Sequence, residues 1–170
     1  GCSYYRCYDK ASSRVAEDGG DSKQKDPDYT ASLMGAKDKE GNIYILGNYI
    51  RDGEGNQLGR YRENPGPRDQ LIERQAMLDG CDVVQYLPQD PAAAGKVEYQ
   101  ESAKKLQKLG IIVKPDPNPS NKSKKTRFLP FCSACYNGQI YFVKNTFDPD
   151  FWDYLLLELE NFDGNKNSGY

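Results

Sequence analysis

The sequence contains no histidine among its 170 residues. This absence excludes Ser-His-Asp and Cys-His nucleophile systems, His-containing zinc motifs and His-based acid/base catalysis within the chain. Long hydrophobic runs are also missing: no stretch approaches the ~20 apolar residues that a membrane span requires, and the first residues lack the pattern of a signal peptide. We therefore expect a protein of the cytosol, whose chemistry must come from carboxylates, Lys, Tyr, Cys or a bound metal.

The chain also lacks a strong net charge: it has 23 Lys and Arg and 25 Asp and Glu, a formal net charge of -2. The charges are nevertheless segregated. Residues 96–127 hold nine basic and three acidic residues, a net charge of +6, whereas residues 145–170 hold six acids and one Lys, a net charge of -5. The near-neutral total therefore does not argue against a nucleic-acid partner.

Only 37% of the residues are hydrophobic, but 13 Tyr, 6 Phe and 1 Trp supply large side chains for a core. The length suits one domain, residues 1–170, and no linker divides the chain. Five cysteines are an odd number, which favours reduced thiols over a disulfide scaffold. The Cys132–Cys135 pair has the spacing of half a zinc site, but no second pair completes it, and on a helix we expect both thiols to point inward.

Hydrophobic patterns and turn residues predict an alternating order of strands and helices. Strands are expected at 4–8, 29–36, 42–50, 82–87, 111–113 and 139–143. Helices are expected at 65–80, 92–109, 126–136 and 148–159. The first three strands form an antiparallel meander, and helical crossovers then add parallel strands. This order predicts an α/β fold of the RNase H-like type: a mixed sheet with helices on both faces.

Two acids lie at the ends of predicted strands, where the active-site residues of such a sheet are found. Asp9 ends the first strand and Asp90 follows the strand at 82–87, so we expect both at the carboxyl-terminal edge of the sheet. Carboxylates gathered from distant positions suit Mg²⁺ or Mn²⁺, which prefer oxygen ligands. Each acid also has an ordinary interpretation: Asp9 as a turn residue or cap, and Asp90 as the N-cap of the next helix. Asp28 either joins the metal ligands or is a polar loop residue.

Several basic residues, most of them in and around the loop at 115–125, are candidates for contacts with phosphates. They are Lys96, Lys122, Lys124, Lys125 and Arg127. Phosphate contact and plain solvation explain them equally well. The segment 92–97 is not a phosphate-binding loop, because Asp90 stands where the loop needs its first Gly and Val97 where it needs Ser or Thr, so we expect no ATP hydrolysis.

Four stretches together resemble a known family. They are Tyr8-Asp9-Lys10-Ala11 with the later DPDYTA at 26–31, QDPAAAGK at 89–96, KKTR at 124–127 with Pro130, and LELENF at 157–162. In this order they resemble the carboxyl-terminal nuclease domain of the terminase large subunit of tailed phages and related viruses. The four stretches span nearly the whole chain.

The resemblance implies a metal-dependent endonuclease that cuts concatemeric double-stranded DNA during genome packaging, with Asp9 and Asp90 as ligands of two Mg²⁺ or Mn²⁺ ions. It also implies assembly in the host cytoplasm with the terminase ATPase motor, and with the portal and small terminase subunit. Two positions depart from the family pattern. Pro88 stands where many relatives have Glu, and the third acid is expected beyond Tyr170, since Asp163 has the sequence of a turn.

Two other functions remain open at this point. The chain could be another RNase H-like nuclease or transposase. It could also be a catalytically silent RNase H-like module that docks DNA or an assembly partner.

Overall fold

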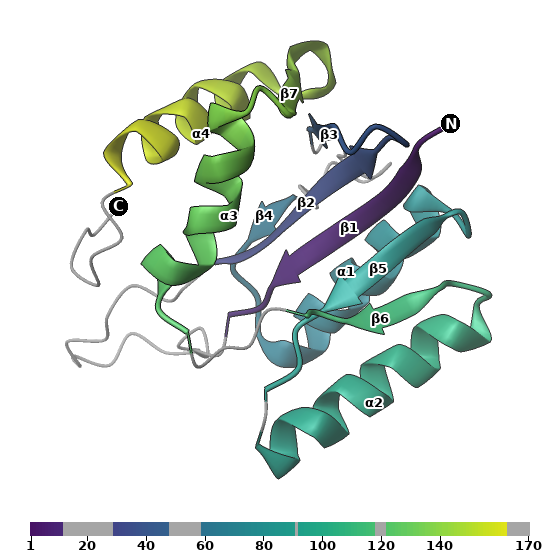
Figure 1. The fold of residues 1–170 in the computed structure, drawn as a ribbon. Coiled ribbons are helices and arrows are strands. Elements are labelled where there is room, and N and C mark those ends of the chain that lie inside the picture. Colours follow the sequence, from purple (N-terminus) through teal and green to yellow (C-terminus); the bar gives the residue numbers. More distant parts are fainter. Residues whose placement is uncertain (12–28, 48–58, 91, 118–121, 163–170) are drawn as a thin grey trace, which may run out of the picture.

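The computed structural model describes residues 1–11, 29–47, 59–90, 92–117 and 122–162 (Figure 1). In these residues the chain forms a seven-stranded mixed sheet with the strand order β6-β5-β1-β2-β3-β7, and β4 pairs with β2 beside this path. The predicted α/β architecture is confirmed. The segment 48–50, predicted as the end of the third strand, lies outside the described residues.

The antiparallel half of the sheet is the predicted meander. Strand β1 (Ser3–Asp9) pairs with β2 (Thr30–Lys37), which pairs with β3 (Ile43–Leu46). The β2–β3 turn is tight because Gly41 takes a φ of 92° and the Asp38 carboxylate accepts a hydrogen bond from the Asn42 N–H at 2.8 Å. A two-residue strand, β4 (Arg60–Tyr61), adds to β2 and was not predicted, since two residues carry no periodic signal.

The parallel half is built through helical crossovers. Helix α1 (Pro65–Asp79) leads to β5 (Val83–Leu87), which lies parallel to β1. Helix α2 (Ala93–Lys108) then leads to β6 (Val113–Pro115), parallel to β5.

At the other end of the sheet, α3 (Lys124–Tyr136) precedes β7 (Ile140–Val143), which lies parallel to β3. A short 3₁₀ helix (Lys144–Thr146) and α4 (Pro149–Asn161) complete the described fold. The 3₁₀ helix was not predicted.

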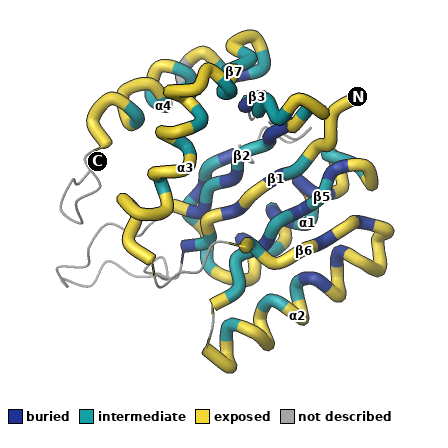
Figure 2. The backbone as a smooth tube through the Cα atoms, viewed as in Figure 1, coloured by how far each residue is buried: buried dark blue, intermediate teal, exposed yellow. Residues whose placement is uncertain are grey.

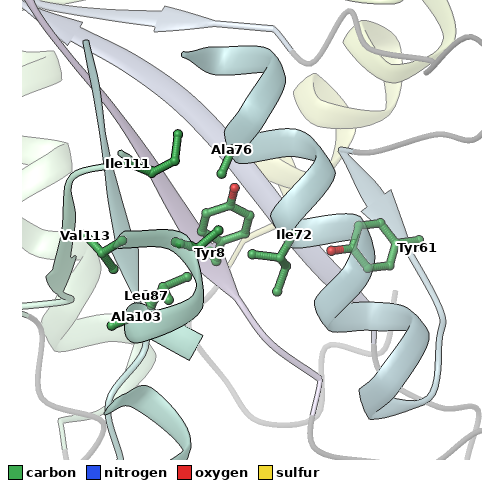
Figure 3. Packing of buried hydrophobic residues seen from close by; sticks show 9 residues of the cluster. Tyr8, Tyr61, Ile72, Ala76, Leu87, Ala103, Ile111 and Val113 are labelled. Atoms are coloured by element: carbon green, nitrogen blue, oxygen red, sulfur yellow. The ribbon is translucent and has the colours of Figure 1, made fainter. Parts of the chain in front are cut away.

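Helices α1 and α2 bury the main apolar core against one face of the sheet (Figure 3). Ile72 and Ala76 come from α1, and Ala103 and Leu106 from α2, at the helical spacing that the sequence shows. The remaining members come from the sheet and its connections: Tyr8, Tyr61, Leu87, Ile111 and Val113. Buried and more exposed residues alternate along β5 and the second half of β1, because only one face of these strands packs on this core (Figure 2).

The second pair of helices lies toward the β7 end of the sheet (Figure 1). Helix α4 packs Trp152 on Phe142 of β7, and the Phe128 ring of α3 contacts Phe162 at a centroid distance of 4.5 Å. No residue of α3 is buried. The expectation that Cys132 and Cys135 point inward is therefore wrong: both cysteines are exposed, because no side of α3 is buried against the rest of the fold.

A buried charge pair lies between β1 and α1. The Arg6 side chain is 0% exposed and that of Asp79 is 1% exposed, and the guanidinium donates twice to the carboxylate, at 2.6 and 2.8 Å. Gln75 and Gln85 each donate to the same carboxylate at 3.0 Å. Tyr8 extends the network by donating to the Gln85 oxygen at 2.8 Å. Such a pair is tolerated inside a protein because its remaining hydrogen-bonding atoms are satisfied.

We expect Asp79→Asn to lower the free energy of unfolding by about 3–5 kcal/mol, because the substitution leaves the Arg6 charge buried without its counter-ion. Chemical denaturation measures the change. Asp82→Asn, which neutralises an exposed acid three residues away, serves as the matched control and should change stability by less than about 0.5 kcal/mol. Equal effects of the two substitutions would contradict a stabilising role for the pair.

Candidate functional site

Three neighbouring parallel strands each deliver an acid to the same edge of the sheet. Strand β1 ends at Asp9, β5 is followed after two residues by Asp90, and β6 is followed directly by Asp116. Ligands in open α/β sheets bind outside the carboxyl ends of such strands. All three acids line one cavity of about 640 Å³. The prediction that Asp9 and Asp90 meet at this edge agrees with their position.

Asp90 lies against the first turn of α2. The N-cap of α2 is Ala92, without a side-chain cap bond, so the alternative that Asp90 is the N-cap does not apply. Instead, the Asp90 carboxylate accepts only a long bond of 3.4 Å from the Ala92 N–H. Gly95 lies so close that an added Cβ would overlap the Asp90 Cβ and approach its carbonyl oxygen to 2.8 Å. Glycine at 95 therefore permits the position of Asp90.

Asp116 is a site residue that the sequence reasoning did not select. Its backbone N–H donates to the Leu87 carbonyl at 2.8 Å, which fixes it beside the end of β5. Its charge is felt at Cys7 in the same cavity: burial raises the pKa of that thiol to about 11, and the Asp116 carboxylate adds to the rise. The sequence signal for Asp116 is an acid that directly follows the third parallel strand.

Helix α4 forms the opposite wall of the cavity through Phe151, Leu155 and Glu158. The cavity also contains Cys7, which alternates with the core-facing Tyr8 along β1, so α4 covers the face of the sheet opposite α1. Helices thus cover both faces, as predicted. The wall places one further carboxylate, that of Glu158, in the cavity.

Arg60 of β4 attaches this wall to the sheet. Its guanidinium carbon lies 3.8 Å from the Tyr29 ring centroid and 4.3 Å from that of Tyr154 on α4. It also donates to the Tyr154 hydroxyl at 3.0 Å, and Glu158 lies 4.0 Å away. Cation–π contacts of this kind contribute about 0.5–2 kcal/mol each.

The predicted basic residues divide into two groups. Arg127, in the first turn of α3, lines the cavity with the acids. The other four are exposed and do not belong to the cavity lining: Lys96, Lys122, Lys124 and Lys125. The structure therefore brings one predicted cation to the predicted acids. Asp28 and Asp163 lie outside the described residues.

The carboxylate oxygens that line the cavity are the type of ligand that a hard divalent cation prefers. Five acids line it against three cations, Lys10, Arg68 and Arg127. Within the described part of the chain, no three His, Cys, Asp or Glu side chains lie close enough together to hold a metal ion. Mg²⁺ is commonly bound by one or two carboxylates and completed by water and substrate phosphates, so the carboxylates of Asp9 and Asp90 fit such an ion without a closed protein cage.

Comparison with known proteins assigns the family. The family model described as the terminase RNaseH-like domain matches residues 15–167, nearly the whole chain. No curated protein and no solved structure matches the chain. Among the described residues, no helix has the length and apolar character needed to cross a membrane.

Gly95→Ala should displace Asp90. Alanine normally stabilises a helix relative to glycine, but here the added methyl group overlaps the Asp90 backbone and Cβ, so we expect a loss of about 1–3 kcal/mol. Gly66→Ala in the first turn of α1 is the matched control, because its Cβ would meet nothing within 4 Å. Thermal unfolding distinguishes the two variants, and a gain in stability for Gly95→Ala would contradict the close packing.

The Cys7 thiol should react slowly at neutral pH. With its pKa at about 11, only about one molecule in ten thousand carries the thiolate at pH 7, and the rate of alkylation should rise tenfold per pH unit up to about pH 11. Asp116→Asn should lower this pKa, because it removes a negative charge that disfavours the thiolate. Mass spectrometry of iodoacetamide labelling follows the reaction. An unchanged profile in Asp116→Asn would show that the two groups do not interact.

Proposed function

The chain belongs to the terminase RNase H-like domain family, and on that premise we propose that it is a metal-dependent endonuclease that cuts double-stranded DNA during viral genome packaging. The observation that carries the proposal is the convergence of Asp9, Asp90 and Asp116 from three parallel strand ends on one cavity. The family supports a terminase module of nuclease type. The metal dependence and the cutting reaction are the proposal.

Each carboxylate has a stated part in the proposed reaction. Asp9 and Asp90 would hold Mg²⁺ or Mn²⁺, two ions in all, and Asp116 would add a further carboxylate to the wall of the same cavity. Such ions supply an ionised water and neutralise charge on the phosphodiester. The carboxylates would hold the ions, and a metal-activated water would make a histidine base unnecessary in this chain, which contains none.

DNA would approach the cavity past α3. Arg127 can donate two parallel hydrogen bonds to a phosphate, which sets the position of the backbone at the acids. The exposed Lys122, Lys124 and Lys125 extend the same positive region, in keeping with binding that does not depend on sequence. Lys96, in the first turn of α2, would contribute at most a peripheral contact.

The family also supports partners in packaging. We propose that the domain works in the host cytoplasm beside the terminase ATPase motor, with the portal and the small subunit as further partners. A second candidate function is a docking module without catalysis. It is favoured by one observation, that no three potential metal ligands are grouped among the described residues.

Nicking of supercoiled plasmid distinguishes the two functions. With Mn²⁺ or Mg²⁺ we expect wild-type protein to convert the plasmid to open circles, and chelation to stop the reaction. Asp9→Asn and Asp90→Asn should each reduce the rate by more than the roughly 10- to 100-fold typical of outer-shell substitutions, and Asp116→Asn by at least that amount. Asp82→Asn, at the opposite end of β5, is the control and should retain the wild-type rate. Absence of nicking at every metal concentration would favour the docking module.

A further inference from the structure

Two cations in the cavity wall are buried rather than available to solvent. The side chain of Lys10, which follows Asp9, is 9% exposed, and that of Arg68 on α1 is 6% exposed. Both contact the carboxylate of Glu98 on α2, at 3.1 Å from Lys10 Nζ and 2.9 Å from Arg68 Nη2. A single carboxylate thus joins the end of β1 to the helix that follows Asp90.

Each of the three guanidinium nitrogens of Arg68 donates a hydrogen bond to a different residue. Nε donates to Asp69 at 2.9 Å, Nη1 to the Ala11 carbonyl at 2.9 Å, and Nη2 to Glu98. The bond to Ala11 is buried, and the N–H of Ala11 donates in turn to Thr30 Oγ1 at 3.0 Å. The planar, rigid fork of arginine suits this three-way contact, which the single ammonium of lysine cannot reproduce.

These contacts leave Asp9 little freedom to move. The residue after it is held through the Lys10 side chain, and the next is held at both its N–H and its carbonyl group. The two bonds of Ala11 are buried, so a shift of the chain just after Asp9 would strain or break them. A precise metal site requires that each ligating side chain is held in position by packed and hydrogen-bonded neighbours.

We propose that Arg68, together with Glu98, is the positioning device of the site: it holds the carboxyl-terminal end of β1 so that the Asp9 carboxylate faces the cavity opposite Asp90. This inference rests on the proposed nuclease function. Arg68 is a positioning residue and not a DNA contact, because its donors already bind Asp69, Ala11 and Glu98 and its side chain is buried.

Arg68→Lys is the main test, and Arg74→Lys is its matched control on the exposed side of α1. Glu98→Gln is a second, milder variant, paired with Glu101→Gln, an exposed acid one turn further along α2. Three quantities are measured: hydrogen exchange at the Ala11 amide, Mn²⁺ affinity by electron paramagnetic resonance, and kcat and KM for plasmid nicking. The first does not depend on metal or activity.

We expect Arg68→Lys and Glu98→Gln to speed exchange at Ala11 and to weaken Mn²⁺ binding by about 10- to 100-fold. We also expect kcat to fall while KM for DNA stays within about twofold, because DNA binding uses other residues. Higher Mn²⁺ concentration should recover part of the lost rate. The two control variants should match wild type in all three measurements.

The outcomes separate this inference from the function on which it rests. Unchanged exchange at Ala11 in Arg68→Lys would overturn the positioning role, whatever the activity of the wild-type protein. Faster exchange with unchanged Mn²⁺ affinity and kcat would overturn it as well, and would leave Arg68 as a stabilising contact only. Wild-type protein that neither binds Mn²⁺ nor nicks DNA would instead overturn the proposed nuclease function.

Discussion

The buried ion pair of Arg6 and Asp79 is the constraint on which the arrangement depends. Asp79 is the last residue of α1, a position where the helix dipole disfavours an acid, yet its carboxylate accepts four hydrogen bonds there. Because Arg6 lies in β1 and Gln85 in β5, the pair fixes α1 against the two strands whose ends carry Asp9 and Asp90. This buried network therefore joins α1 to the two strands whose ends line the cavity. The apolar core of α1 and α2 packs on the same face of the sheet, and the buried pair adds directional hydrogen bonds to that packing.

The order and direction of the strands bring the acids of the cavity together. Parallel pairing of β1, β5 and β6 brings three acids to one edge, although more than 100 positions separate the first from the last in the sequence. The same cavity receives Arg127 from α3 and Glu158 from α4. Acidic and basic side chains therefore line the cavity together, and the acids outnumber the cations. Smaller contacts complete the arrangement: Gly95 makes room for Asp90, and Arg68 holds the end of β1.

The parts that the sequence predicts well are those with a local signal. Strands β1, β2 and β5 and helices α1 and α2 follow from periodicity, from proline at helix starts and from glycine at helix ends, as at Gly80 with its φ of 84°. The positions of Asp9 and Asp90 at the sheet edge follow from their places at strand ends, whereas their role as metal ligands stays a prediction. Asp116, the Arg6–Asp79 pair and the exposure of Cys132 could not be predicted, because each depends on which surfaces meet in three dimensions. An acid after a proline has the same sequence signature in a solvated loop as at a cavity wall.

Arg60 anchors a cavity wall that is synthesised late, because its partner Tyr154 lies in α4. The acids of β1, β5 and β6 are complete once residue 116 has left the ribosome, whereas the wall with Phe151 and Leu155 emerges 35 or more residues later. Until Tyr154 reaches the guanidinium of Arg60, the strand ends face solvent on one side. The nascent chain thus carries the three strand-end carboxylates before helix α4 supplies the opposite wall of the cavity.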